Sequence, residues 1–408
     1  SAASGATGTY VQKSDPTPKG GEQSQYAWTR IYAIESIPGL ANTLVVAAKG
    51  MGILRTTNFN LGAAGVQYFT ATGITADRAR GLANHASAAQ DTFWMPLENG
   101  GVMKATNAGS TWTPFNSFAY LGATPTLGAP DPYLLSAQAI AADPSSTSVV
   151  LVGSRGAGLH ALNGGGTGWD NTGVPAITRN DGVDFKPQSL AIPSSGLVFY
   201  TLFDGVTGGK AGGLLRSSTG PANLAQTPYP DDIVSCATPA AALGSAYRVI
   251  PTSGSRTYLL RYDGLPYRST DNFATNTAGC VTAPDTGFQR LAFFDIAEQP
   301  TNTAILVAAT NKGIYRSTDS GANWARLSTT GLATPVLASV AFNAAGYLYG
   351  VTRDGSLLCS ADNGVNWQAV SLGSLPAVSF REVRIIKGQV HIVTDGGGIY
   401  NGFTSTCP

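Results

Sequence analysis

A short turn motif recurs along the chain and constrains the fold more than any other feature. It reads Ser-x-Asp-x-Gly-x-x-Trp at 317–324 and at 360–367, with a weaker copy at 105–112. In such a turn the aspartate accepts hydrogen bonds from backbone N–H groups, the glycine adopts positive φ, and the indole packs beside it. We name it the Asp-Gly-Trp turn. Its predicted structural residues are Asn107, Gly109, Trp112, Asp319, Gly321, Trp324, Asp362, Gly364 and Trp367.

A short apolar strand leads into each turn and repeats along the whole chain. Eight copies occur, at 52–58, 101–107, 158–163, 213–218, 265–271, 313–319, 356–362 and 398–402. A period of about 50 residues fits a four-stranded propeller blade and is too long for most solenoids. Upstream of each copy lies a run rich in β-branched and aromatic residues, which predicts a second strand. In five repeats we identify a further apolar segment before that run, which predicts an innermost strand.

The composition agrees with many short strands and excludes several classes of partner. The chain has 408 residues, 43% of them apolar, with 50 glycines and 23 prolines but no collagen period. Only 12% of residues are charged and the net charge is +1, so we expect neither a nucleic-acid nor an anionic-membrane partner. No apolar run approaches 18 residues, so no membrane-spanning helix is predicted.

The Asp-Gly-Trp turn resembles the Asp-box of the bacterial-neuraminidase-type (BNR) repeat found in sialidases, family-74 glycoside hydrolases, sortilin and photosystem II assembly-factor propellers. The resemblance spans about residues 26–403 and implies an all-β chain, a single β-propeller of four-stranded antiparallel blades. The eight copies favour eight blades, and seven is the alternative if the fourth or fifth copy is an insertion. We expect the propeller to occupy 26–408. Residues 1–25 would supply a closing strand at 8–13, which completes the last blade, and a linker.

Four cysteines predict two disulfides and an oxidising compartment. Cys236 and Cys280 are about one repeat apart, as are Cys359 and Cys407. Cysteines at equivalent places on adjacent repeats would reach each other, so we predict Cys236–Cys280 and Cys359–Cys407 bonds; free buried thiols are the alternative. Together with the low charge, disulfides favour a secreted or cell-surface protein, with the periplasm as a further option.

The predicted binding site lies on the face opposite the Asp-Gly-Trp turns, since in the families that the chain resembles these boxes face away from the active site. The turns between second and third strands carry most of the scarce charges, which makes the channel mouth the default site. Paired, solvated turn charges are the alternative interpretation. The candidate residues are Lys49, Glu98, Arg155, Asp204, Arg261, Asp263, Lys312, Arg353, Asp354 and Asp395. Arg30, Arg78, Arg80, Lys186, Arg290 and Arg381 are expected near the same mouth, at the starts of innermost strands.

Two functions remain open at the level of sequence. The first is a non-catalytic scaffold that binds a protein partner, a glycan or copies of itself. The second is a single-propeller glycoside hydrolase, sialidase-like or xyloglucanase-like, which requires two carboxylates about 5–10 Å apart at the channel mouth. Neither function calls for a cofactor. No metal site is predicted either, because the three histidines fall at unrelated positions in different repeats and the cysteines lack ligand spacing.

Overall fold

The computed structural model divides into two compact units, Ser1–Asp77 and Arg78–Pro408, and each is described by itself. In the first unit, strands β1 (Ile31–Ser36), β2 (Leu44–Ala48), β3 (Gly52–Thr56) and β4 (Thr70–Ala71) form one antiparallel sheet in that order. The residues that the structure describes are 31–36, 44–48, 52–56, 70–71, 78–84, 92–98, 101–105, 112–115, 137–143, 146, 148–154, 158–162, 166–170, 187–202, 213–220, 225–226, 246–261, 264–275, 279–281, 291–332, 336–372, 378–396, 398–403 and 407.

The described residues of the second unit form seven antiparallel sheets, each made of strands consecutive in sequence. The first two are β5 (Ala83–Asn84), β6 (Phe93–Leu97), β7 (Gly101–Ala105), β8 (Trp112–Pro114), and β9 (Ala137–Ala142), β10 (Val150–Ser154), β11 (Gly158–Leu162), β12 (Trp169–Asp170). The next two are β13 (Pro187–Ser194), β14 (Leu197–Leu202), β15 (Gly213–Ser217), β16 (Ala225–Gln226), and β17 (Ala246–Pro251), β18 (Thr257–Arg261), β19 (Gly264–Ser269), β20 (Gly279–Cys280).

Three sheets complete the second unit. They are β21 (Phe293–Glu298), β22 (Leu306–Thr310), β23 (Gly313–Ser317), β24 (Ala325–Arg326); β25 (Ser339–Phe342), β26 (Leu348–Val351), β27 (Leu357–Ser360), β28 (Gln368–Ala369); and the three-stranded β29 (Ser379–Ile386), β30 (Gln389–Asp395), β31 (Ile399–Phe403). The prediction of an all-β chain built from four-stranded antiparallel sheets is confirmed. Within the described ranges, no helix has the length and hydropathy that crossing a membrane requires.

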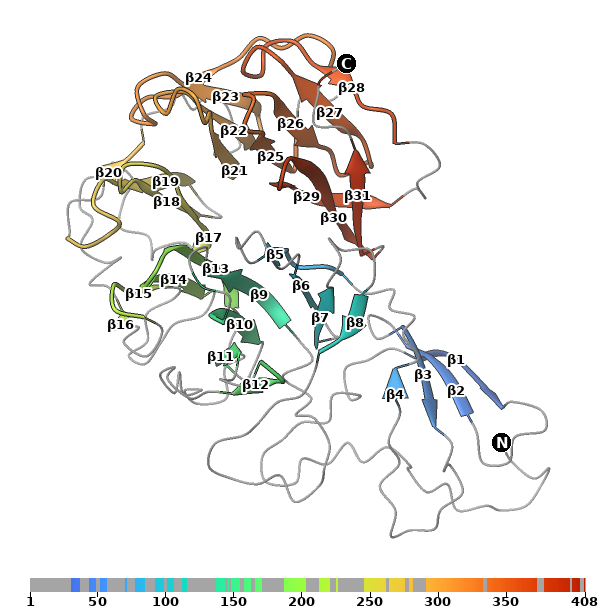
Figure 1. Cartoon of the computed structure of the whole chain (residues 1–408). Helices are drawn as coiled ribbons and strands as arrows, with labels where there is room; N and C mark the ends of the chain where they lie inside the picture. Colours follow the sequence, from blue (N-terminus) through green and yellow to red (C-terminus); the bar gives the residue numbers. More distant parts are fainter. Residues whose placement is uncertain are drawn as a thin grey trace. The chain divides into compact units, whose positions relative to one another are not determined.

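Figure 1 labels the strands of these sheets. Among the described residues, seven apolar clusters join neighbouring sheets of the second unit. The one that closes the circle packs Phe93 and Met95 of β6 against Val393 of β30, so the last sheet touches the first of this unit. Contacts therefore run from sheet to sheet around the described part of the second unit. The fourth and fifth copies of the repeat each lie in a four-stranded sheet, in β15 and β19, so neither is the insertion that the seven-bladed alternative required. The prediction of eight blades with a closing strand stays a prediction, because residues 8–13 lie outside the described ranges.

The Asp-Gly-Trp turns have the hydrogen bonds expected from their residues. The Asp319 carboxylate accepts from Asn323 N at 2.9 Å and from Ser317 Oγ at 2.8 Å. The Ser317 hydroxyl in turn accepts from Gly321 N at 2.8 Å, and the Trp324 indole donates to the Gly321 carbonyl at 3.0 Å. Gly321 has φ of 78° and lies so close to Tyr258 of the preceding sheet that any side chain would clash. The turn therefore also anchors one sheet to the next.

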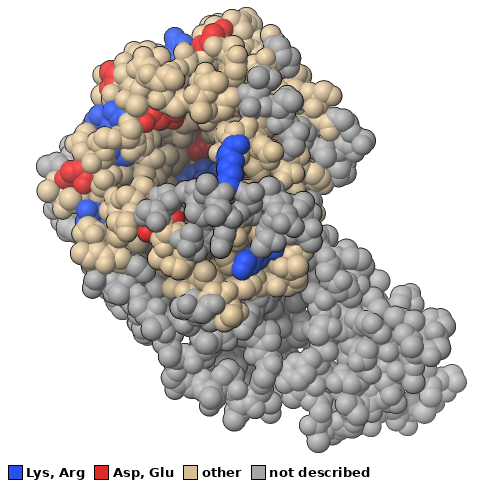
Figure 2. Space-filling view, in the orientation of Figure 1, with Lys and Arg blue, Asp and Glu red and all other residues tan. Residues whose placement is uncertain are grey.

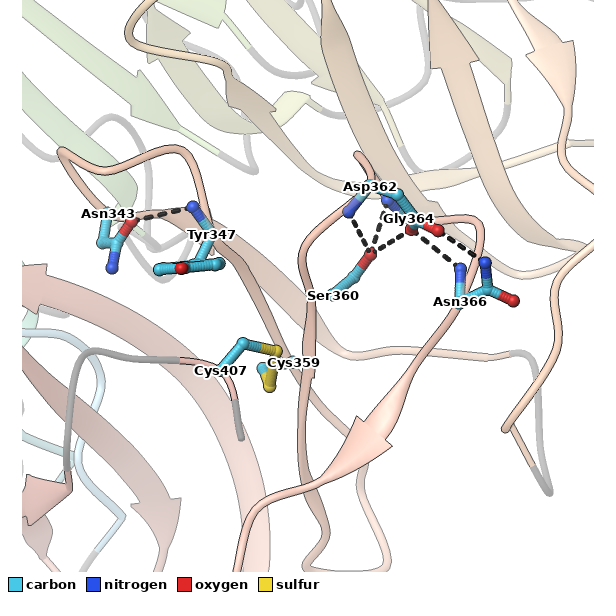
Figure 3. The surroundings of a disulfide bond; sticks show 8 residues. All are labelled: Asn343, Tyr347, Cys359, Ser360, Asp362, Gly364, Asn366 and Cys407. Atoms are coloured by element: carbon cyan, nitrogen blue, oxygen red, sulfur yellow. Dashed lines mark hydrogen bonds between the residues drawn. A yellow bond between two sulfur atoms is a disulfide. The ribbon is translucent and has the colours of Figure 1, made fainter.

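The second complete copy repeats this geometry around Asp362 (Figure 3). A third turn, after β19, lacks both the glycine and the tryptophan. There Phe273, with φ of 56°, occupies the glycine position, while Ser269 and Asp271 make the same bonds. The serine and aspartate are therefore the parts of the motif that hold the turn. Trp112 begins β8, and Asn107 and Gly109 lie outside the described ranges.

A disulfide ties the C-terminal end of the chain to the preceding sheet. Cys359, fully buried in β27, is bonded to Cys407 (Figure 3). This confirms one of the two predicted pairs. Closing a loop of 48 residues stabilises the fold by about 4 kcal/mol in the chain-entropy model. Cys236 and the side chain of Cys280 lie outside the described part of the chain, so the second pair stays a prediction.

We expect Asp362→Asn to destabilise the protein at neutral pH and to have less effect in acid. Burial disfavours the carboxylate, but hydrogen bonds from Asn366, Ser360 and Val365 outweigh it and hold the pKa of Asp362 below its ordinary value. The stabilisation is complete above the unfolded pKa of about 3.9 and is lost as pH falls through the folded pKa. Urea unfolding of both proteins at pH 7 and pH 3 measures this. A stability deficit that is equal at the two pH values would contradict it.

Candidate functional site

The innermost strands of five sheets in the second unit carry a β-bulge near their starts. In β29, for example, Phe380 pairs with Thr394 and Glu382 pairs with Val393, which leaves Arg381 as the extra residue. Such bulges bend a strand and redirect its side chains. The extra residues are Gln138, Gln188, Tyr247, Phe294 and Arg381.

The residue after the bulge links its sheet to the next one. The Ser189 hydroxyl accepts from Val249 N at 3.4 Å, and Asp295 Oδ2 accepts from Val340 N at 3.2 Å. Ser339 takes the equivalent place in β25, where its hydroxyl accepts from Val383 N at 3.2 Å. We name these links, from residues 189, 295 and 339 to the following sheet, the inner belt. They satisfy buried backbone donors where the sheets converge.

Two carboxylates and two arginines continue the inner belt. Arg248 Nη2 lies 2.6 Å from Glu382 Oε1 and 3.3 Å from Asp295 Oδ1. Arg384 also donates to Glu382 Oε1, at 2.8 Å. Burial raises the pKa of Asp295, whereas for Glu382 the nearby Arg384 and Arg248 outweigh burial and lower the pKa. Both carboxylates are therefore engaged by guanidinium groups.

A cavity of about 470 Å³ lies where the innermost strands converge. Its wall contains bulge residues from four innermost strands and the turn residue Arg353, so it lies toward the strand-two to strand-three turns. The strand register places the Asp-Gly-Trp turns at the other end of the sheets. Figure 2 shows basic side chains gathered in and beside the central hollow. The arginines on its wall are Arg78, Arg80, Arg248, Arg353, Arg381 and Arg384, and the carboxylates are Glu382 and Asp395.

The remaining arginines of the cavity have weaker counter-charges. Glu98 is shared by Arg80, at 2.8 Å, and Arg78, at 3.7 Å. Arg381 Nη1 lies 3.6 Å from Asp395 Oδ1, which is longer than a hydrogen bond. Arg353 lies over the Phe294 ring at 5.9 Å. The cavity therefore has short ion pairs at residues 80, 248 and 384, whereas Arg353 and Arg381 have no carboxylate within hydrogen-bonding distance among the described residues.

The structure brings some of the candidate residues together and separates others. Arg353 and Asp395 line the cavity, and Glu98 pairs with two of its arginines. Arg261 is buried elsewhere, where it donates to the Tyr267 hydroxyl at 3.1 Å. Lys312 and Asp354 are not part of the cavity wall. Lys49, Arg155, Asp204 and Asp263 lie outside the described ranges, as do Arg30, Lys186 and Arg290.

Sequence analysis missed Arg248, Arg384, Asp295 and Glu382. Each is a charged residue inside an innermost strand, and that is the signal that could have found them. Arg248 and Asp295 stand between mostly apolar residues, whereas Glu382 and Arg384 share β29 with Arg381. Arg78, Arg80 and Arg381, which were expected near the channel mouth, all line the cavity. No cluster of three or more His, Cys, Asp or Glu side chains suited to a metal ion occurs in the described part of the chain.

Comparison with solved structures identifies the fold, and comparison with curated sequences finds a short match to an enzyme. No family model matches the chain. A xyloglucanase of Hypocrea jecorina is 31% identical over 114 residues, which covers 26% of this chain and only 14% of that enzyme.

Two solved structures are similar over most of this chain. YCF48 bound to D1 peptide has a TM-score of 0.56 at 15% identity, covering 81% of this chain and 94% of that one. The extracellular domain of the putative one-component system BT4673 from B. thetaiotaomicron has a TM-score of 0.54 at 13% identity, covering 80% of this chain and 38% of that one. The chain therefore has a β-propeller fold.

We expect Ser339→Ala to lower the free energy of unfolding by about 1–3 kcal/mol. The variant removes an acceptor from buried Val383 N and a donor from buried Asp295, so both groups lose a hydrogen-bond partner. Urea denaturation measures the loss. Ser356→Ala is the matched control, because Ser356 is exposed. Equal stability of the two variants would show that the inner belt does not stabilise the fold.

Proposed function

We propose that this chain is an exported Asp-box propeller that binds a protein or glycan partner. The central cavity holds an anionic group of that partner. The observation that carries this proposal is the gathering of six arginines around one cavity of about 470 Å³. Pockets of this volume suit a small group or a chain end. Guanidinium groups bind carboxylates and phosphates with two parallel hydrogen bonds, which favours an anionic ligand.

The surroundings of the carboxylates support binding over catalysis. Glu382 Oε1 is held by Arg248 and Arg384, and Asp295 is held by Arg248 and by backbone N–H groups, so both carboxylates serve to join the innermost strands. The similarity to YCF48, which was solved with a peptide, is compatible with a propeller that binds a protein chain. The match to an extracellular domain and the Cys359–Cys407 bond are compatible with an exported location.

Alanine at Arg381 should weaken partner binding. We suggest screening the protein on an array of neutral and acidic glycans and, in parallel, on an array of peptides with acidic C-termini. Arg381→Ala should weaken any binding found by at least about tenfold, since a charge-assisted hydrogen bond contributes roughly 1.5–3 kcal/mol. Arg326→Ala, on the exposed strand β24, should bind as the unmodified protein does. Partners that are neutral, or that bind both variants equally, would overturn the proposal.

A glycoside hydrolase is the second candidate, and two observations favour it. The xyloglucanase match is one. The other is that Asp295 and Glu382 contact the same guanidinium while their pKa values shift in opposite directions, a pattern typical of acid–base pairs.

We expect the protein not to hydrolyse xyloglucan oligosaccharides or sialyllactose, because both carboxylates are held in ion pairs. Release of reducing sugar or sialic acid measures this. Hydrolysis that Glu382→Gln abolishes, with the fold intact by circular dichroism, would replace the binding proposal with the enzymatic one. Hydrolysis that is unchanged in Glu382→Gln would point to a contaminating enzyme and leave the prediction standing.

A further inference from the structure

One position on the third strands of the sheets carries a link to the following sheet. Arg216 of β15 and Arg268 of β19 hold this position, since each pairs with the first residue of the short fourth strand. Arg216 Nε donates to Asn272 O at 2.7 Å, and Arg268 Nε donates to Ser320 O at 3.0 Å. Both carbonyls belong to the Ser-x-Asp turn of the next sheet, so we name this bond the arginine link. Arg316 holds the position in β23 as well, but makes no such bond among the described residues.

A cysteine holds this position in β27. Cys359 pairs with Gln368, the first residue of β28, so it has the same place in its sheet as the two arginines have in theirs. The following sheet, β29–β31, has no Ser-x-Asp turn after its third strand, because residues 404–408 read Thr-Ser-Thr-Cys-Pro. Cys407 in that stretch is bonded to Cys359 instead. The disulfide therefore joins two sheets at a place where the turn that would accept an arginine link is missing.

The disulfide belongs to the apolar cluster that holds the last sheet. Cys359 is fully buried in the same cluster as Phe380 of β29, and Cys407 packs against that cluster from its edge. Phe380 is followed directly by Arg381, and both residues line the cavity. The cluster that contains the disulfide therefore also holds the part of β29 that forms the cavity wall.

A dithiol can reduce this bond by two successive exchanges. Its first thiolate attacks Cys407 Sγ, because Cys407 is partly exposed whereas Cys359 is fully buried. The bond between the two cysteines breaks, and Cys359 leaves as a thiolate that takes up a proton. The second thiol of the reductant then displaces Cys407 from the mixed disulfide. The protein gains two electrons and two protons as two thiols, and the dithiol is oxidised to a cyclic disulfide.

We propose that the Cys359–Cys407 bond is a redox switch for the attachment of the last sheet. In the oxidised state the bond fixes β31 and its sheet to β27. Reduction by a dithiol removes this link, and no Ser-x-Asp turn is present to replace it with an arginine link. The last sheet then separates more readily from the preceding one, and the cavity wall that it carries becomes less ordered. This inference goes beyond the proposed function, since it concerns the state of the wall and not the ligand.

Hydrogen–deuterium exchange of the whole protein, read by mass spectrometry, tests the switch. After treatment with dithiothreitol, the amides of β29–β31 should exchange at least about tenfold faster, while those of β9–β12 keep their rates. Cys407→Ser should show the same acceleration without reductant, and dithiothreitol should add nothing to it in β29–β31. Cys280→Ser is the matched control: its β29–β31 amides should exchange as in the unmodified protein and should still respond to dithiothreitol.

Two results would overturn the switch. One is unchanged exchange of β29–β31 in protein whose reduction is verified by alkylation of Cys359 and Cys407. The other is faster exchange in all seven sheets alike, which would show that the bond stabilises the whole fold and not the attachment of one sheet. Neither result bears on the anionic partner, because exchange is measured without a ligand. Conversely, a failure to find any partner on the arrays would leave the switch in place.

Discussion

The structure of the second unit depends on how its innermost strands are joined where they converge. In β13 and β21 the residue after the bulge bonds to the following sheet, and Ser339 of β25 makes the equivalent link; these are the three links of the inner belt. Asp295 and Glu382 are almost fully buried there, at 3% and 6% exposure. A buried carboxylate needs charged or hydrogen-bonding partners, because an unpaired one costs several kcal/mol. Arg248 therefore belongs to the packing of the sheets as much as to the cavity.

The turns and sheets could be predicted from the sequence because they depend on the chemistry of residues close together in the chain. Ser317, Asp319 and Gly321 form their turn within five residues, so the motif predicts that turn wherever the chain folds. The repeat of strand and turn predicted the sheets in the same way. By contrast, Arg248 and Glu382 are 134 residues apart and meet only because the sheets form a circle. A bulge has no comparable local signature, which is why four charged residues in and beside the cavity, Arg248, Asp295, Glu382 and Arg384, were not predicted.

The two ends of the sheets use carboxylates in different ways. At the Asp-Gly-Trp turns, backbone and serine hydrogen bonds outweigh burial and lower the pKa of Asp319 and Asp362. At the cavity end, Glu382 is buried, and the neighbouring guanidinium groups outweigh that burial and lower its pKa. Turn carboxylates bonded to their own backbone have little left to offer a ligand. Arg353 and Arg381, which have no carboxylate within hydrogen-bonding distance among the described residues, retain both charge and donors. This contrast is the physical reason for placing the proposed function at the cavity.

Ligand binding at the cavity would also act on the place where the circle closes. Arg80 belongs to a segment in which Ala79 N donates to Thr394 O of the last sheet, while Arg381 is part of that last sheet. Without an anion the two guanidinium groups repel each other across this junction. An anion between them would replace the repulsion with attraction to both sides. Because a ligand stabilises the state that binds it, the contact that recognises the partner would also strengthen the junction between the first and last sheets of the circle.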